Sequence, residues 1–178
     1  MTAKSQRRPQ EGFTLIETMI AIAVLSFGVL ALVAVFTQGI SYVATSQMDL
    51  VAKEKAAEAV ETVFTARDKQ VLTWAQIRNV SDGGVFLDAP QPLVDPGPDG
   101  LVGTGDDDAS KPDAIVLPGP DNTLGTADDE VVPLSSFTRE IKVRDVSPNL
   151  REVQIVIRYT VGRFNRQYVL VTQISSFA

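Results

Sequence analysis

Two copies of an acidic motif hold most of the side chains that could do chemistry in this 178-residue chain. The first repeat reads PGPDGLVGTGDDD (residues 96–108), and the second repeat reads PGPDNTLGTADDE (residues 118–130). Calcium takes about six to eight hard oxygen ligands, and glycine-rich turns can bring carboxylates and carbonyls onto one centre. We therefore expect up to two Ca²⁺ sites. The carboxylates would come from Asp99, Asp106, Asp107 and Asp108 in the first repeat, and from Asp121, Asp128, Asp129 and Glu130 in the second.

The spacing of these acids sets the limits of the calcium hypothesis. It is not that of an EF-hand, because the D-x-D-x-D-G pattern is missing. It resembles the short Asp-Gly loops of exported bacterial proteins that bind calcium. The alternative is a solvated acidic linker, since stretches rich in Pro, Gly and Asp are also typical of disorder.

Histidine and cysteine are both absent from the sequence. Their absence excludes disulfides, thiol nucleophiles, Cys-rich zinc sites and every Ser-His-Asp arrangement. An enzyme would have to work with carboxylates, lysine or tyrosine alone. The composition therefore favours a protein without catalytic activity.

The net charge of −6 is unevenly distributed along the chain. Residues 82–130 contain twelve acidic residues and a single basic one, Lys111. From Val131 onward seven basic residues outnumber three acidic ones. The acidic segment repels nucleic acid, and no aromatic and basic motif accompanies the basic one, so nucleic acid is not an expected partner.

A glutamate, Glu17, lies near the start of a long apolar run that follows Lys4, Arg7 and Arg8. Residues 18–47 carry no charge, and about 20 apolar residues at 1.5 Å each are enough to cross a membrane. The basic flank predicts a cytoplasmic amino terminus. A carboxylate at the centre of such a helix costs about 2.5 to 3.5 kcal/mol, and somewhat less near an end, so Glu17 should have a partner.

The hexapeptide GFTLIE (residues 12–17) lies between this basic leader and the apolar helix. It resembles the class III signal of type IV prepilins and type II secretion pseudopilins. The resemblance implies that a membrane-embedded prepilin peptidase cuts after Gly12 and methylates the new amino terminus at Phe13. It also implies that Glu17 neutralises the amino terminus of a neighbouring subunit during assembly. An uncleaved signal anchor is the alternative.

The same resemblance implies a division of the chain and a route through the cell. Residues 1–12 would be the cleaved leader, residues 13–36 the transmembrane and later filament-core half of a helix, and residues 37–178 a periplasmic or extracellular domain. The precursor would cross the bacterial inner membrane once. The mature subunit would then join other pilin or pseudopilin subunits at the cell surface or in a periplasmic pseudopilus.

Apolar periodicity predicts an α+β fold for the remainder. No proline interrupts residues 12–67, so one helix of about 50 residues is expected. Its later part should pack on a sheet through Ala56, Ala57, Val60, Val63 and Phe64.

Three alternating segments near the carboxyl end, residues 137–146, 151–161 and 166–175, predict a small antiparallel sheet within residues 135–178. With an irregular acidic loop between helix and sheet, the layout matches the pilin-like roll that the resemblance implies.

Two further segments, NVSDGGVF and TQISSFA, resemble those of minor pilins of the PilV type. Family major pilins often carry a disulfide loop at the carboxyl end, which a chain without cysteine cannot form. A minor pseudopilin of a type II secretion system is the alternative within the family. A membrane-anchored, exported calcium-binding protein that never polymerises is the alternative outside it.

Overall fold

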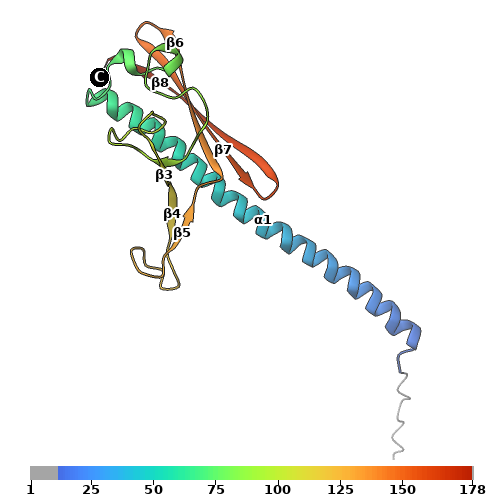
Figure 1. Ribbon diagram of the computed structural model, residues 1–178. Coiled ribbons are helices and arrows are strands. Elements are labelled where there is room, and N and C mark those ends of the chain that lie inside the picture. Colours follow the sequence, from blue (N-terminus) through green and yellow to red (C-terminus); the bar gives the residue numbers. More distant parts are fainter. Residues whose placement is uncertain (1–11, 178) are drawn as a thin grey trace, which may run out of the picture. The chain divides into compact units, whose positions relative to one another are not determined.

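The computed structural model describes residues 12–177 and divides them into two units, one ending at Ala44 and one beginning at Thr45. Helix α1 (Leu15–Asp68) contributes residues to both units (Figure 1). Apart from Gly12, the predicted leader lies outside the described residues. The combination of one long helix and a small antiparallel sheet confirms the predicted α+β class.

In the first unit, α1 is apolar on every side. Its large side chains from Leu15 to Val43 are exposed, and the helix is long and apolar enough to cross a membrane. A helix that is hydrophobic all round is suited to lipid or to packing among other helices. The charge-free stretch in the sequence is therefore the exposed apolar surface of this unit.

In the second unit, α1 packs through a narrow stripe of small side chains. The stripe follows helical spacing and is almost fully buried; it consists of Ala52, Ala56, Ala59, Val63 and Ala66. The predicted face was correct at Ala56 and Val63, and Val60 and Phe64 lie partly buried at its border. It was wrong at Ala57, which is exposed, because the buried stripe turns toward Ala59 instead.

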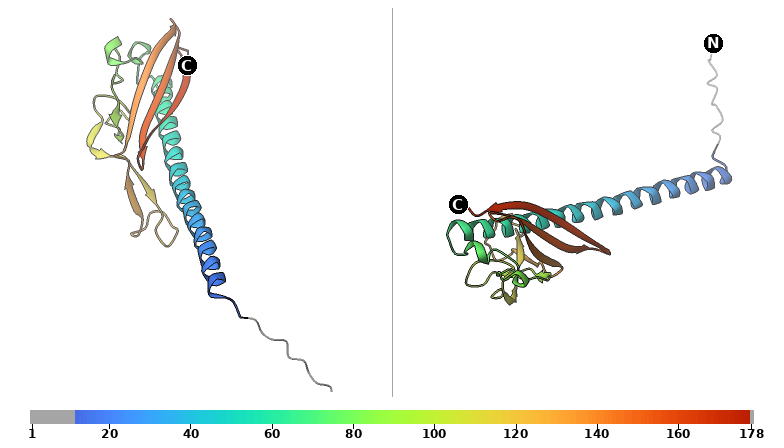
Figure 2. Two further views of the ribbon diagram at one scale, coloured as in Figure 1. Left: turned by 90° about the vertical axis from the view of Figure 1, so that its right-hand side faces the viewer. Right: turned by 90° about the horizontal axis from the view of Figure 1, so that it is seen from above.

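The stripe faces a four-stranded antiparallel sheet whose strand order is β1-β6-β7-β8. Both views in Figure 2 show the long strands beside the part of α1 that begins at Thr45. The strands are β1 (Gln91–Pro92), β6 (Phe137–Ser147), β7 (Leu150–Val161) and β8 (Phe164–Ser175).

Side chains alternate across this sheet as the sequence predicted. Ile155 and Ile157 of β7 are fully buried under the helix, and Ile141 and Leu170 are the direct partners of Ile155 on the two neighbouring strands. The residues between them point to the opposite face, which we call the outer face of the sheet.

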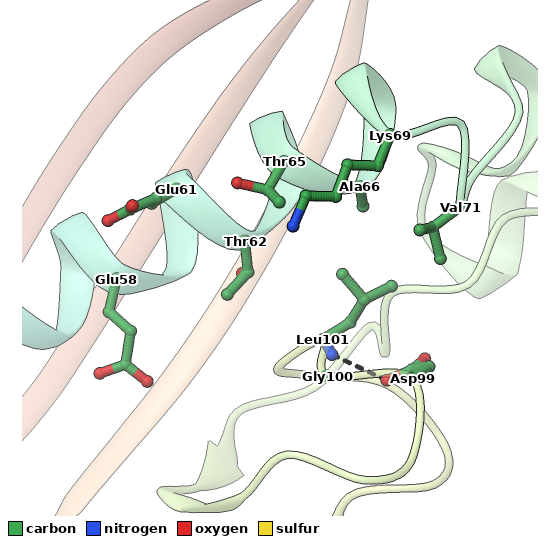
Figure 3. A pocket seen from close by; sticks show the side chains of 10 residues that line it. All are labelled: Glu58, Glu61, Thr62, Thr65, Ala66, Lys69, Val71, Asp99, Gly100 and Leu101. Atoms are coloured by element: carbon green, nitrogen blue, oxygen red, sulfur yellow. Dashed lines mark hydrogen bonds between the residues drawn. The ribbon is translucent and has the colours of Figure 1, made fainter.

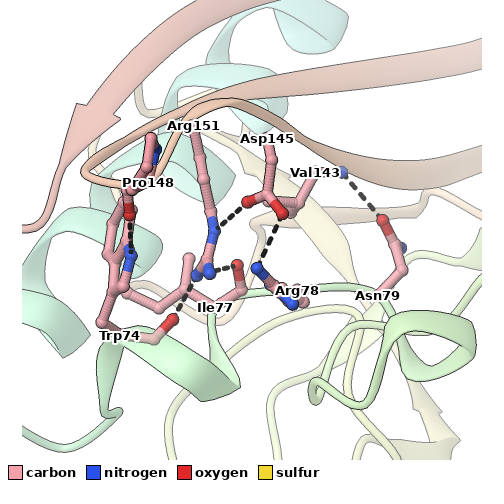
Figure 4. A network of polar contacts seen from close by, with 8 residues as sticks. All are labelled: Trp74, Ile77, Arg78, Asn79, Val143, Asp145, Pro148 and Arg151. Carbon is pink, nitrogen blue, oxygen red and sulfur yellow. Dashed lines mark hydrogen bonds and ion pairs between the residues drawn. The ribbon is translucent and has the colours of Figure 1, made fainter.

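Two short 3₁₀ helices connect α1 to the acidic segment, Trp74–Gln76 and Val80–Asp82. Figure 4 shows that the first of them is tied to the sheet by Arg151 of β7. The buried Arg151 guanidinium donates to the carbonyl oxygens of Trp74 and Ile77, stacks 4.1 Å from the centre of the Trp74 ring, and pairs with Asp145 at 2.7 Å.

Asn79 makes a second connection between this segment and the sheet. Its amide nitrogen donates to the Ile141 carbonyl at 2.7 Å, and its amide oxygen accepts from Val143 N at 2.8 Å. One side chain thus satisfies both a donor and an acceptor of β6, as a further strand would. The connection from helix to acidic segment is fixed at two points.

The acidic segment is more regular than expected, because it contains two short antiparallel ribbons. Strand β2 (Val94–Asp95) pairs with β3 (Asp108–Pro112), and β4 (Ala114–Leu117) pairs with β5 (Glu130–Pro133). The first repeat connects β2 to β3, and the second repeat connects β4 to β5. Strands this short have too few alternating positions to be predicted from periodicity.

Replacing Arg151 with alanine should lower the free energy of unfolding of residues 45–178 by about 3 kcal/mol. The physical reason is that the carbonyls of Trp74 and Ile77 lose their donor, and Asp145 loses its partner. Unfolding in urea measures this loss.

The matched control is Arg144→Ala, which removes an exposed guanidinium paired with Glu152 at 3.0 Å. Exposed ion pairs contribute less than about 1 kcal/mol, so this variant should unfold near the wild-type midpoint. Equal losses in the two variants would mean that burial adds nothing to the Arg151 network.

Candidate functional sites

The first candidate site is the start of α1, where the structure places Thr14 in the N-cap position. Thr14 Oγ1 accepts a hydrogen bond from Glu17 N at 3.3 Å, and Thr14 O accepts one from Thr18 N at 3.2 Å. Glu17 lies in the first turn of the helix. An acid in this position interacts favourably with the helix dipole, by about 0.3 to 1 kcal/mol when exposed.

This capping role of Thr14 was missed in reading the sequence. The signal was present, since a threonine followed three residues later by glutamate is the spacing of a capping box. Glu17 therefore has a local reason to be in the chain. That reason does not exclude a partner for its carboxylate, which is exposed and forms no ion pair within residues 12–177.

The predicted cleavage junction lies just ahead of this helix start. Gly12 and Phe13 are outside the helix and exposed, and no atom lies within 4 Å of where a side chain on Gly12 would begin. A peptidase binds its substrate most easily where the backbone is free of helical hydrogen bonds. The junction thus lies just ahead of the first turn of α1, which contains Glu17.

The second candidate site consists of the two acidic repeats, each of which contains the same pattern of hydrogen bonds within its own loop. Leu101 N donates to Asp99 Oδ1 at 2.8 Å, and Thr104 Oγ1 donates to Asp106 Oδ1 at 2.7 Å. Gly103 N donates to Asp107 Oδ2 at 2.7 Å. The carboxylates thus hold the turns of their own loop.

Each bond has its counterpart in the second repeat. Thr123 N donates to Asp121 Oδ1 at 2.8 Å, and Thr126 Oγ1 donates to Asp128 Oδ1 at 2.7 Å. Gly125 N donates to Asp129 Oδ2 at 2.6 Å. The agreement to about 0.1 Å shows that the repeated sequence specifies a repeated fold.

A glycine near the start of each repeat is required by the close approach of the loop to itself. A side chain on Gly97 would begin 2.3 Å from the carbonyl oxygen of Asp106, and one on Gly119 would begin 2.3 Å from that of Asp128. No larger residue fits without moving the backbone. The second residue of the PGPD motif is therefore explained by packing within the loop.

The same bonds shift the acidity of the carboxylates. The Thr104 hydroxyl lowers the pKa of Asp106, and the Thr126 hydroxyl lowers the pKa of Asp128 in the same way. Burial raises the pKa of Asp99, and the nearby Asp106 charge adds to that effect. Asp106 and Asp128 therefore carry full negative charge at neutral pH.

Asp108 and Glu130 lie outside these networks, at the first residue of β3 and of β5. Hydrogen bonds from Ser110 lower the pKa of Asp108, which also pairs with Lys111 at 3.2 Å. The predicted ligand set of each repeat is thus divided, with three acids inside the loop network and one on the adjoining strand.

A cleft of about 400 Å³ adjoins the first repeat. Figure 3 shows α1 on one side of it, with Glu58, Glu61 and Lys69, and the loop with Asp99 and Leu101 on the other. Its lining mixes both charges with threonine and aliphatic side chains. No single class of ligand is favoured by that mixture.

The calcium hypothesis stays a prediction. Within residues 12–177, no group of three or more carboxylates is placed so that it could hold a metal ion. Each carboxylate of the loop networks accepts at least one hydrogen bond, and its oxygens have further lone pairs, so the networks leave acceptor capacity. Calcium would have to draw these groups together.

Comparison with known families locates a match at the first site. Residues 7–33 match the family described as the prokaryotic N-terminal methylation motif. The matched segment contains the Gly12-Phe13 junction, Glu17 and much of the apolar part of α1. It supports a type IV pilin-like or pseudopilin-like precursor that is processed by a prepilin peptidase and assembles with other such subunits. Comparison with curated proteins and with solved structures finds no match.

If the repeats bind calcium, the ion should raise the melting temperature of residues 45–178. At a free concentration of ~100 times the dissociation constant, each site would stabilise the fold by about 2.7 kcal/mol. Magnesium should do much less, because it requires a stricter octahedron. The measurement is thermal melting in chelator, in millimolar calcium and in millimolar magnesium. Identical midpoints, or equal responses to the two ions, would leave the repeats as hydrogen-bonded loops without a calcium site.

Proposed function

We propose that this chain is a minor pilin of the PilV type, a structural subunit of a type IV pilus. The observation that carries the proposal is the Gly12-Phe13 junction, exposed and two residues ahead of a helix whose first part is apolar on all sides. Cleavage there would leave Phe13 as a methylated amino terminus at the start of that helix. Residues 13–36 would then cross the membrane and later pack in the filament core, with residues 37–178 as the exported domain.

Glu17 would serve assembly through its charge. Among the described residues no cation lies within ion-pair distance of its carboxylate. In a membrane or a filament core, an unpaired carboxylate is unfavourable, whereas the amino terminus of a neighbouring mature subunit offers a positive charge. This pairing would favour the arrangement in which Glu17 of one subunit lies beside the amino terminus of its neighbour.

The location of the mature protein distinguishes this proposal from its alternatives. A pilin should be found in filaments sheared from the cell surface. A pseudopilin of a type II secretion system should stay in the periplasm with its secretion machine, and an anchored protein that never polymerises should stay in the membrane fraction.

Mass spectrometry of the mature protein from cells that assemble it should find a chain that begins at N-methylated Phe13. Replacing Gly12 with leucine should leave the precursor uncut, because a large side chain keeps the backbone away from the catalytic groups of the peptidase. An intact Met1 terminus in the assembled fraction would contradict the proposed cleavage after Gly12.

Glu17→Val should insert into the membrane as well as the wild type or better, yet enter filaments poorly. The lost helix-dipole interaction is only about 0.3 to 1 kcal/mol, too little to unfold a helix of this length. Glu17→Asp is the matched control, since it keeps the charge and should retain much of the assembly. Quantitative blotting of sheared filaments measures both, and wild-type incorporation of Glu17→Val would exclude the proposed pairing.

A further inference from the structure

The two repeats have the same fold but opposite surroundings. In the first repeat the middle of the loop is part of the core, with Leu101 3% exposed, Val102 1% and Thr104 4%. Gly103 O accepts a hydrogen bond from Leu87 N at 2.9 Å, and a side chain on Gly103 would begin only 3.0 Å from Ile141 Cδ1. The first repeat thus shows how this loop packs on a protein surface.

The second repeat has the same backbone network but no such surface beneath it. Leu124, which occupies the place of Val102, is 62% exposed. Figure 1 shows the loop at the far end of the β4–β5 ribbon, which extends away from β6, β7 and β8. On the ribbon itself Val116 and Val131 are direct partners, and both are largely exposed.

These exposed side chains form an apolar tip that would gain from being covered. Burying a Leu or Val side chain contributes about 1.5 to 3 kcal/mol, and exposed apolar groups with a polar rim are typical of interaction sites. Because the first repeat buries the equivalent residue in the core, the shape of the loop is already suited to docking. The second repeat is the same docking element turned outward.

Charge indicates what kind of surface it would dock on. In the first repeat Asp108 pairs with Lys111. Burial lowers the pKa of Arg139, and the Asp107 charge partly offsets that effect. In the part of the chain that the structure describes, no ion pair involves the acids of the second repeat, Asp121, Asp128, Asp129 and Glu130. A partner surface should therefore be apolar at its centre and positively charged around it.

The outer face of the sheet has that chemistry. Val169 and Val171 of β8 are 38% and 51% exposed there. The neighbouring strands place three cations on the same face, where they form ion pairs with the two carboxylates of Glu140 and Glu152 and leave one net positive charge. The cations are Lys142, Arg144 and Arg158.

We propose that the second repeat of one copy docks on the outer sheet face of a second copy, with Leu124 beside Val169 and Val171. The inference rests on the proposed function and deepens it by naming a contact between subunits. The two surfaces are different, so the contact is heterologous. Each copy would keep one free tip and one free face, which allows an open chain of subunits.

Disulfide cross-linking of full-length protein in detergent tests the contact, because the natural chain has no cysteine. Leu124→Cys on one copy and Val171→Cys on another should form a mixed disulfide dimer roughly tenfold faster than Leu124→Cys with Glu61→Cys. Glu61 is also exposed but lies on α1, which covers the inner face of the sheet. Raising the salt concentration should slow the specific cross-link.

Equal rates for the two pairs, or disulfide dimers formed only between two copies of the Leu124→Cys variant, would overturn the proposed contact. Leu124→Asp provides a second readout that does not depend on disulfide geometry. Because Leu124 is exposed, this variant should fold normally and be cut after Gly12, but enter filaments several-fold less often.

The outcomes separate this inference from the function on which it rests. Normal cleavage and normal filament entry of Leu124→Asp, with no specific cross-link, would remove the contact and leave the pilin proposal intact. An uncut chain that still forms the specific cross-link would contradict the pilin proposal and leave the contact between copies intact. Poor filament entry without the specific cross-link would assign the tip to a different protein and exclude the second copy.

Discussion

The rest of the second unit depends on the close contact between α1 and the inner face of the sheet. The chain has no disulfide, so this contact and the core beneath it hold the fold together. The helix presents mainly alanines, which contribute little buried area each but let its backbone approach the sheet closely. Larger side chains on the strands, such as Ile155 and Ile157, then fill the space between the layers.

Polar contacts fix the position of the helix along the sheet, which apolar packing alone leaves loosely specified. The Tyr159 hydroxyl of β7 donates to Asp49 Oδ1 of α1 at 2.5 Å. Burial, together with this bond, raises the pKa of Tyr159 from its ordinary value of 10.0 to about 12. Because the folded pKa is the higher one, this contribution to stability is complete below pH 10 and is lost only as the pH rises through about 12.

The sequence predicted the elements whose apolar pattern is long enough to repeat. The uncharged stretch after Glu17 and the alternation around Ile155 each contain many consistent positions, so helix and sheet were both expected. The exact face of α1 was less predictable, because alanine is tolerated in either environment, and Ala57 could not be told from Ala59. At the amino-terminal site, the motif indicated Gly12, Phe13 and Glu17, but the capping role of Thr14 was overlooked.

The acidic repeats show most clearly what a local pattern can and cannot specify. Their internal hydrogen bonds join residues at most seven positions apart, so the loop fold follows from its own sequence and forms twice. Burial follows instead from contacts with distant residues, such as Ile141 for the first repeat. The thirteen residues of each repeat do not by themselves reveal that Val102 lies in the core and that Leu124 lies at an exposed tip.

Duplication of a loop that already packs on a protein surface offers a simple physical route to a new interaction surface. The shape and the acceptor groups of the loop are set by its own hydrogen bonds, so a second copy needs only a ribbon that carries it clear of the core. The ribbon β4–β5 does this with four residue pairs. Among the described residues, the acids of the second loop form no ion pair, whereas Asp108 of the first repeat pairs with Lys111. The unpaired acids and the exposed Leu124 together define the partner that the second loop would recognise.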